Sequence, residues 1–287
     1  MPSTYAHYRM GQQVRNRLHG PESEVIEKHP ELYQVGLHGP DILFYYKALI
    51  PNRVNKEGSA HHERSGAAFF THAAQVIRSH PGEDAYLAYT YGVLCHFGLD
   101  ATCHGYINQH VIDSGVAHNE IETEFDRMLM VHDAFDPITH SMIGHIERAV
   151  DRFDLKRDIN HQFGNEVESD PYEVISAFYP GISDADIRKS LKGMIFCHKM
   201  YRAPSPQKRA VCFGLMHLIG MYGKLRGYFV NYEPDPECEE SNAALTPLYQ
   251  KGEKRSRALI ESFGTFLDGT AVPDPLYACN FEGVIPD

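Results

Sequence analysis

Apolar residues recur at intervals of three and four along most of the chain, whereas strict alternation of apolar and polar positions is scarce. The clearest examples are the stretches 84–111, 118–135 and 137–155. This spacing places apolar side chains along one face of a helix. The pattern therefore predicts a mostly α-helical protein.

Further stretches show the same periodicity, and several carry signals for helix ends. Helices are expected within 24–36, 58–84, 183–202, 204–230 and 251–269. Ser183 is a candidate N-cap, Pro206 a candidate first residue and Gly269 a candidate C-cap. Irregular polar connections are expected around 36–58, 158–172 and 231–245, and long loops of this kind often line functional sites.

The organisation of the chain favours one domain. Its 287 residues are 43% hydrophobic, which is enough for a sizeable core. Glycine and proline are spread throughout, with no fixed repeat and no low-complexity linker between halves. We therefore expect a single domain over residues 1–287.

The charge balance excludes several classes of function. With 27 Lys and Arg against 38 Asp and Glu, the formal net charge is −11, which disfavours general attraction to double-stranded nucleic acid or anionic membranes, although a local basic site stays open. No apolar run approaches the roughly 18 residues of a membrane span, and the start lacks the pattern of an export signal. A cytoplasmic location is the expectation. The six cysteines form no Cys-x-x-Cys pair, so neither a disulfide framework nor a zinc ribbon is indicated.

Histidine is the unusual residue, with 18 in the chain. In CHFGLDATCHGY, the residues His96, Asp100 and His104 follow one another at steps of four, which puts all three on one helix face. His118 and Glu122 repeat the step in the next predicted helix. Such pairs often lie on a solvated helix face, but two pairs plus a third ligand among apolar residues favour a metal site. Nitrogen and carboxylate ligands suit zinc.

These residues, with three earlier ones, carry a resemblance to a known family. His7 in TYAHYRMG, Asp41 in GLHGPDILFYY and His62 in SAHHERSGAAFF precede the runs HFGLDATCH and HNEIE. In residue types, order and spacing the chain resembles the zinc-dependent phospholipase C family, which is related to single-strand-specific zinc nucleases. The motifs cover about residues 4–130, and the remainder, 131–287, is compatible only in its helical character.

The resemblance implies an all-α fold of the phospholipase C and zinc nuclease type, with up to three zinc ions. One ion would take Asp41, His62, His96 and Asp100. A second would take His104, His118 and Glu122. A third would take His7, the shared carboxylate of Asp100, and the backbone amine and carbonyl of Pro2 after removal of Met1.

Some positions depart from the family pattern or leave a choice open. Ile42 stands where the well-known secreted enzymes have a choline-binding aromatic residue, so a choline pocket has no support. His61 competes with His62 as ligand, and His62 is preferred because Phe69 and Phe70 follow it at the family's distance.

Further residues are candidates for a supporting role or for a head-group pocket. His38, Glu63 and Asp126 are interpreted as supporting or surface groups rather than ligands. The aromatic residues Phe44, Tyr45 and Tyr46 could line a head-group pocket, but an aromatic run is more often core.

The resulting hypothesis is a zinc-dependent phosphodiester hydrolase of phospholipase C type. Asp41 would orient or deprotonate the attacking water, and the substrate would be a small phosphodiester or a phospholipid head group. The alternatives are a single-strand-specific nuclease or nucleotidase-like phosphoesterase, a metallophosphohydrolase built on His132 and Asp133, and a non-catalytic metal-binding protein.

Overall fold

The computed structural model describes residues 4–82, 84–163, 169–268 and 275–286. Within these ranges the chain folds into helices and connecting turns and contains no β-strand, so the predicted all-α fold class is confirmed. Among the described residues, no helix is both long enough and apolar enough to cross a membrane.

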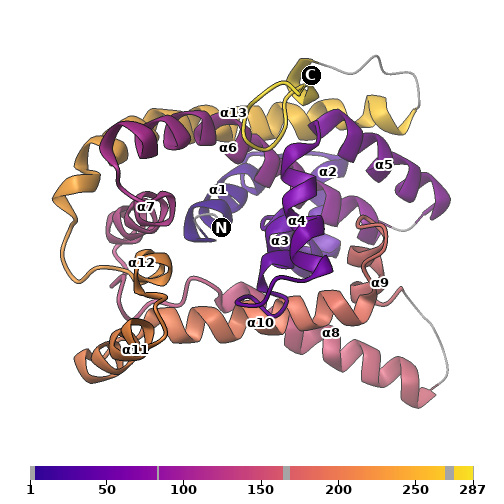
Figure 1. Cartoon of the computed structure of the whole chain (residues 1–287). Coiled ribbons are helices and arrows are strands. Elements are labelled where there is room, and N and C mark those ends of the chain that lie inside the picture. Colours follow the sequence, from indigo (N-terminus) through magenta and orange to yellow (C-terminus); the bar gives the residue numbers. More distant parts are fainter. Residues whose placement is uncertain (1–3, 83, 164–168, 269–274, 287) are drawn as a thin grey trace.

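The helices fall into two series along the chain (Figure 1). The first series comprises α1 (Thr4–Arg15), α2 (Pro21–Lys28), α3 (Pro30–Gly36), the 3-10 helix η1 (Gly39–Tyr45), α4 (Arg53–Glu63), α5 (Gly66–Ser79), α6 (Asp84–Ser114) and α7 (His118–His132). The second comprises α8 (Gly144–Phe163), α9 (Pro171–Ser176), α10 (Asp184–Arg202), α11 (Pro206–Leu218), α12 (Tyr222–Leu225), η2 (Arg226–Tyr228), η3 (Pro236–Cys238), α13 (Glu239–Leu267) and η4 (Pro275–Tyr277).

Two of the three predicted end signals lie within the described residues, and both are found. The Ser183 side chain accepts a hydrogen bond from the Asp186 amide, and the Asp186 carboxylate accepts one from the Ser183 amide, which forms a capping box. Pro206 is the first residue of α11. Gly269 lies outside the described residues.

Several predicted boundaries were wrong. Residues 137–143 are not helical: Asp136 accepts a hydrogen bond from the Ile138 amide at 2.9 Å and forms a local turn, so α8 begins only at Gly144. The stretch 204–230 is interrupted at Gly220, where φ is +68°. The expected loop 36–58 contains η1 and the start of α4.

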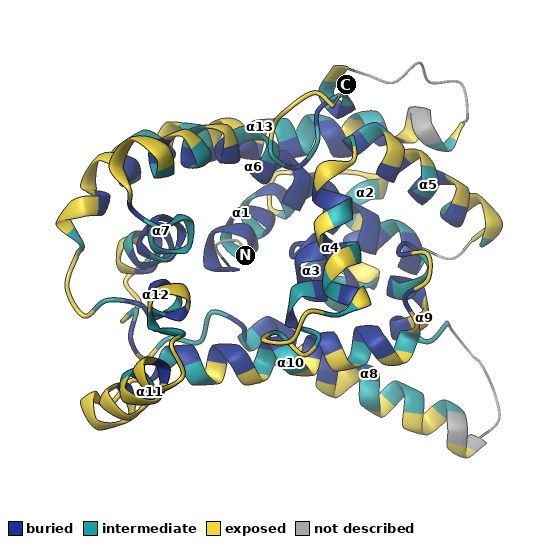
Figure 2. Cartoon of the chain, in the orientation of Figure 1, coloured by how far each residue is buried: buried dark blue, intermediate teal, exposed yellow. Residues whose placement is uncertain are grey.

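Helix α6 is the centre of the fold. It packs along α13 and against α3, and its residues 88–100 are buried on every side (Figures 1 and 2). The crossing with α3 is so close that a Cβ atom on Gly92 would lie 2.2 Å from the carbonyl oxygen of Tyr33. Polar side chains on this part of α6 therefore lie inside the protein, where a charge is costly unless an opposite charge or a cation compensates it.

Candidate metal centre

The candidate ligands on α6 face the interior rather than solvent. His96 and Asp100 are 0% and 2% exposed, and Glu122 on α7 is 4% exposed. The alternative of a solvated helix face is therefore excluded for these residues. Each of these buried polar side chains is costly unless its neighbours or a bound cation compensate it.

One group of side chains joins η1, α4 and α6. Asp41, His62, His96 and Asp100 each offer one ligand atom, and these atoms all lie within 4.8 Å of one another. The separations are 2.9 Å from His62 Nε2 to Asp41 Oδ1, 3.5 Å from His96 Nε2 to Asp41 Oδ2, and 3.2 Å from His96 Nε2 to Asp100 Oδ2. Two ligand atoms held tetrahedrally by one zinc at about 2.0–2.1 Å lie about 3.3 Å apart, so these separations suit a shared ion.

A second group joins α6 to α7 and meets the first at Asp100. It contains His104, His118 and Glu122. Glu122 Oε1 lies 3.3 Å from His104 Nε2 and 3.1 Å from His118 Nε2, and His104 Nε2 lies 3.8 Å from Asp100 Oδ1. The same Asp100 oxygen is 3.0 Å from His7 Nε2. Every described candidate ligand therefore converges on one region, whereas Pro2 lies outside the described residues.

Helix η1 brings Asp41 to the group because Gly39 permits a close approach. Gly39 has a φ of +46°, and a Cβ atom there would lie 2.4 Å from Cδ2 of His96. Only glycine combines that backbone conformation with that contact.

Backbone carbonyl groups fix the orientation of two imidazoles. His62 Nδ1 donates to the Gly58 carbonyl at 2.8 Å, and His104 Nδ1 donates to the Phe281 carbonyl at 3.1 Å. A proton on Nδ1 leaves the lone pair on Nε2, which is the atom that faces the carboxylates. In its neutral form, each ring thus presents the tautomer that a metal requires.

Asp126 on α7 holds the N-terminal end of α1. Its carboxylate accepts hydrogen bonds from the amides of Tyr5 and Ala6 at 2.9 and 2.7 Å. These amides belong to the first turn of α1, whose N–H groups have no partner within the helix. Asp126 therefore positions the turn that carries His7, through backbone amides and not through an imidazole.

The other supporting candidates have different surroundings. His38 Nε2 lies 2.7 Å from His145 Nε2, and the two buried rings form a separate pair. Glu63 lines the pocket described below. His61 stacks edge-on against Phe69 and Tyr179, and burial lowers the pKa of His61 to about 4.

The electrostatics of the site favour a cation. Both carboxylate oxygens of Asp41, Oδ2 of Asp100 and Oε2 of Glu122 are buried and accept no hydrogen bond. Burial opposes a positive charge on His104, but the carboxylates of Asp100 and Glu122 outweigh it and raise the pKa of His104 to about 10. Buried acidic oxygens that accept no hydrogen bond, next to imidazoles whose second proton a cation can replace, make a donor set that fits zinc.

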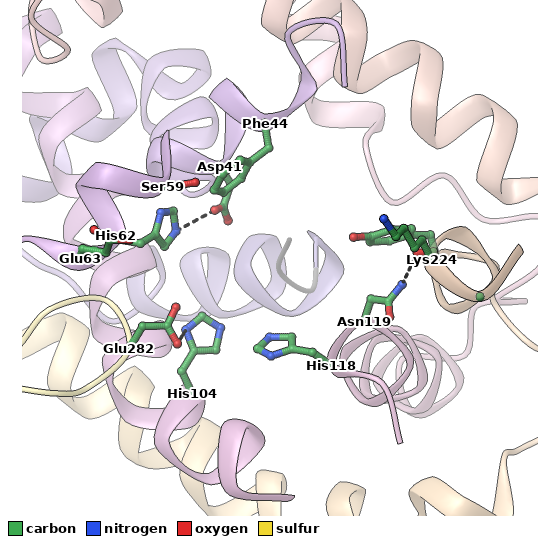
Figure 3. A pocket seen from close by; sticks show the side chains of 12 residues that line it. Asp41, Phe44, Ser59, His62, Glu63, His104, His118, Asn119, Lys224 and Glu282 are labelled. Atoms are coloured by element: carbon green, nitrogen blue, oxygen red, sulfur yellow. Dashed lines mark hydrogen bonds and ion pairs between the residues drawn. The ribbon is translucent and has the colours of Figure 1, made fainter. Parts of the chain in front are cut away.

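The site opens into a pocket of about 530 Å³ (Figure 3). Asp41 and His62 line one side, and His104 and His118 point into it from α6 and α7. The remaining lining residues include Phe44, Ser59, Asn119, Lys224, Tyr228 and Glu282. Of the three aromatic residues considered for a head-group pocket, Phe44 lines this space, whereas Tyr45 belongs to the core.

The C-terminal part of the chain contributes residues that the sequence did not indicate. Phe281 packs against the rings of His62 and His96 at centroid distances of 5.3 and 5.7 Å. Glu282 reaches the pocket beside His104. Neither residue belongs to a periodic stretch or has a ligand at helical spacing, so the sequence offered no signal for them.

His132 and Asp133, the basis of a rival hypothesis, lie apart from the two groups. Asp133 accepts hydrogen bonds from Arg9 Nε at 2.6 Å and from the Tyr5 hydroxyl at 2.7 Å. The His132 side chain is 72% exposed. This pair anchors α1 to the end of α7 and offers no enclosed ligand set.

Comparison with known protein families gives the class of the protein. The family described as zinc dependent phospholipase C matches residues 6–173, which is more than half of the chain. The chain belongs to this family, as the resemblance of its motifs indicated. No curated protein and no solved structure gave a significant match.

Proposed function

We propose that the protein is a zinc-dependent phosphodiester hydrolase of phospholipase C type. The observation that supports this most directly is the convergence of two ligand groups and His7 on Asp100, below one pocket. Family membership supports hydrolase chemistry and the use of zinc.

The two ligand groups would hold two zinc ions, and His7 with Asp100 would contribute to a third. Bound zinc would polarise the phosphoryl oxygens, lower the pKa of a water molecule and neutralise the leaving oxygen. The protein supplies the enclosure: three buried acidic residues and the imidazoles around them, fixed on four elements of the fold.

Asp41 is the proposed catalytic residue. Its carboxylate belongs to the first ligand group and also lines the pocket, so it would contact both the bound ions and the substrate. Asp41 would orient the attacking water and accept its proton. The water oxygen forms a bond to phosphorus, the bond from phosphorus to the alcohol oxygen breaks, and that oxygen takes up a proton to leave as the free alcohol.

The rest of the pocket would bind the two ends of the diester. Lys224 and the Asn119 side-chain amide lie on the side formed by α7 and α12 and provide a charge and donors for an anionic group (Figure 3). Phe44 and Tyr228 provide ring surfaces. The net charge of −11 disfavours a long polyanion, so a phospholipid head group or another small diester is the proposed substrate class.

The test is hydrolysis of bis-p-nitrophenyl phosphate and of a short-chain phospholipid by the purified protein. Activity that a chelator removes and zinc restores would support the proposal. A protein that retains zinc but cleaves neither substrate would instead be the non-catalytic metal-binding protein. Faster cleavage of single-stranded oligonucleotides than of both small substrates would favour the nuclease alternative.

A further inference from the structure

Helix α11 carries an apolar face that nothing in the described structure covers. Val211, Leu215, Leu218 and Ile219, the last directly after the helix, recur at steps of three and four and are 62%, 56%, 82% and 60% exposed. Four large aliphatic side chains on one exposed face are unusual for the surface of a monomeric protein and mark an interaction site.

The opposite face of α11 attaches the helix to the rest of the protein. Arg209 donates a hydrogen bond to the Val230 carbonyl at 2.8 Å, and Met216 is buried. Phe213 packs edge-on against Tyr222 of α12 at a centroid distance of 5.5 Å, and His217 stacks on the same ring at 3.9 Å. The exposed face is therefore not needed for this packing.

This face lies close to the pocket along the chain. Tyr222, which contacts Phe213 and His217 of α11, is followed directly by Gly223 and Lys224. Both Gly223 and Lys224 line the pocket. In Figures 1 and 2, α11 is at the edge of the molecule, and α12 lies between it and the interior. A surface bound to α11 would consequently meet the protein on the side where α12 borders the pocket.

The charge around α11 identifies the kind of surface that fits. The segment from α11 to η2, residues 206–228, contains four Lys and Arg and no Asp or Glu, although acidic residues outnumber basic ones in the whole chain by 38 to 27. Lys208 and Lys224 are exposed. Two copies of such a region would repel each other, whereas anionic lipid head groups would attract it.

We infer that the exposed face of α11 docks the protein onto a phospholipid bilayer that contains anionic lipid. The aliphatic side chains enter the interface, and the basic side chains contact the head groups. The inference rests on the proposed function, because docking serves the protein by bringing lipid head groups to the pocket. The net negative charge of the whole chain does not oppose it, because charges beyond about 8–10 Å are largely screened.

The experiment measures co-sedimentation of the zinc-loaded full chain with vesicles of phosphatidylcholine, with and without phosphatidylserine. The test variant is Leu215→Ser/Leu218→Ser. The matched control is Ile112→Ser on α6, whose side chain is 76% exposed on a helix that does not carry this face. All three proteins are also assayed on bis-p-nitrophenyl phosphate, a soluble substrate whose hydrolysis needs no docking. Their oligomeric state is measured by analytical ultracentrifugation.

We expect the wild type and Ile112→Ser to bind phosphatidylserine vesicles, and the double variant to lose at least about tenfold in affinity with unchanged hydrolysis of the soluble diester. Equal vesicle binding by the double variant, or no binding by the wild type, would overturn the inference. A dimer that the double variant dissociates, without an effect on vesicle binding, would also overturn it and assign the face to a second copy. If no protein hydrolyses the diester but vesicle binding still depends on Leu215 and Leu218, docking stands and the proposed function fails.

Discussion

Gly39 and His96 are in contact across the boundary between η1 and α6. A Cβ atom on Gly39 would lie 2.4 Å from Cδ2 of His96, and the φ of Gly39 is +46°. The contact fixes the distance between the segment that carries Asp41 and the helix that carries Asp100. The ligand geometry therefore depends on a residue that is not itself a ligand.

Gly39→Ala should consequently disturb the metal centre. The new methyl group would displace the His96 ring, and the left-handed backbone would cost about 1–3 kcal/mol. We expect a lower melting temperature and a lower zinc content by mass spectrometry. Gly82→Ala is the control, because Gly82 also has a positive φ of +82° but no atom within 4 Å of its Cβ position. Equal zinc content in both variants would show that the contact with His96 is unimportant.

Asp100→Asn should remove the group shared by both ligand sets. Substitution of residues that only support metal ligands costs about 10–100-fold in affinity or activity, so the loss here should exceed about 100-fold. Diester hydrolysis and bound zinc report the effect. Asp113→Asn, at the exposed end of the same helix, is the control and should keep both. Full activity in Asp100→Asn would contradict the proposed site.

The choice between His61 and His62 can be decided by a pair of variants. His62 Nε2 faces Asp41 at 2.9 Å, whereas His61 is packed between aromatic rings. His62→Ala should therefore lose zinc and activity. His61→Ala should retain zinc and lose stability instead, because it leaves a cavity beside Phe69. Zinc loss in His61→Ala with retention in His62→Ala would reverse the assignment.

The sequence predicted those parts of the site that are encoded by local spacing. His96, Asp100 and His104 share a helix face because a step of four exceeds one helical turn by only about 40°, and the same holds for His118 and Glu122. Their ligand roles stay predictions, but their positions agree with the expected groups.

The remainder of the site depends on contacts between distant segments. Phe281 lies in a short non-helical segment whose place beside His62 and His96 is set by tertiary packing. Lys224 lines the pocket from α12, which begins after the predicted helix is interrupted at Gly220. The start of α8 at Gly144 was missed for a related reason, since a side-chain hydrogen bond at Asp136 competes with helix formation.

Chelation should destabilise the protein, and more strongly at high pH. Burial opposes charge on His7, His62 and His104, but the neighbouring carboxylates outweigh it and raise all three pKa values, that of His104 to about 10. Protonated imidazoles thus compensate the carboxylates in the metal-free protein. This stabilisation is complete below the unfolded-state pKa of about 6.5 and is lost as the pH rises toward the folded value.

The melting temperatures of zinc-loaded and chelated protein should therefore differ more at about pH 9 than at about pH 6.5. Thermal unfolding at both pH values, with and without chelator, measures the difference. In His104→Ala the dependence on pH should become smaller. If the difference in melting temperature stays constant or becomes smaller as the pH rises, protonated imidazoles do not compensate the carboxylates in the metal-free protein.

Asp126→Ala should weaken the site through the position of α1. The variant loses the hydrogen bonds from the Tyr5 and Ala6 amides, at a cost of about 1–3 kcal/mol for the buried groups. His7 follows directly, so its contact of 3.0 Å with Asp100 should loosen and the zinc content should fall. Asp133→Ala is the matched control, because it also loosens α1, but through the side chains of Tyr5 and Arg9 and not through the first-turn amides. Both variants should melt earlier, but only Asp126→Ala should lose zinc; equal zinc contents would mean that Asp126 stabilises the helix without positioning His7.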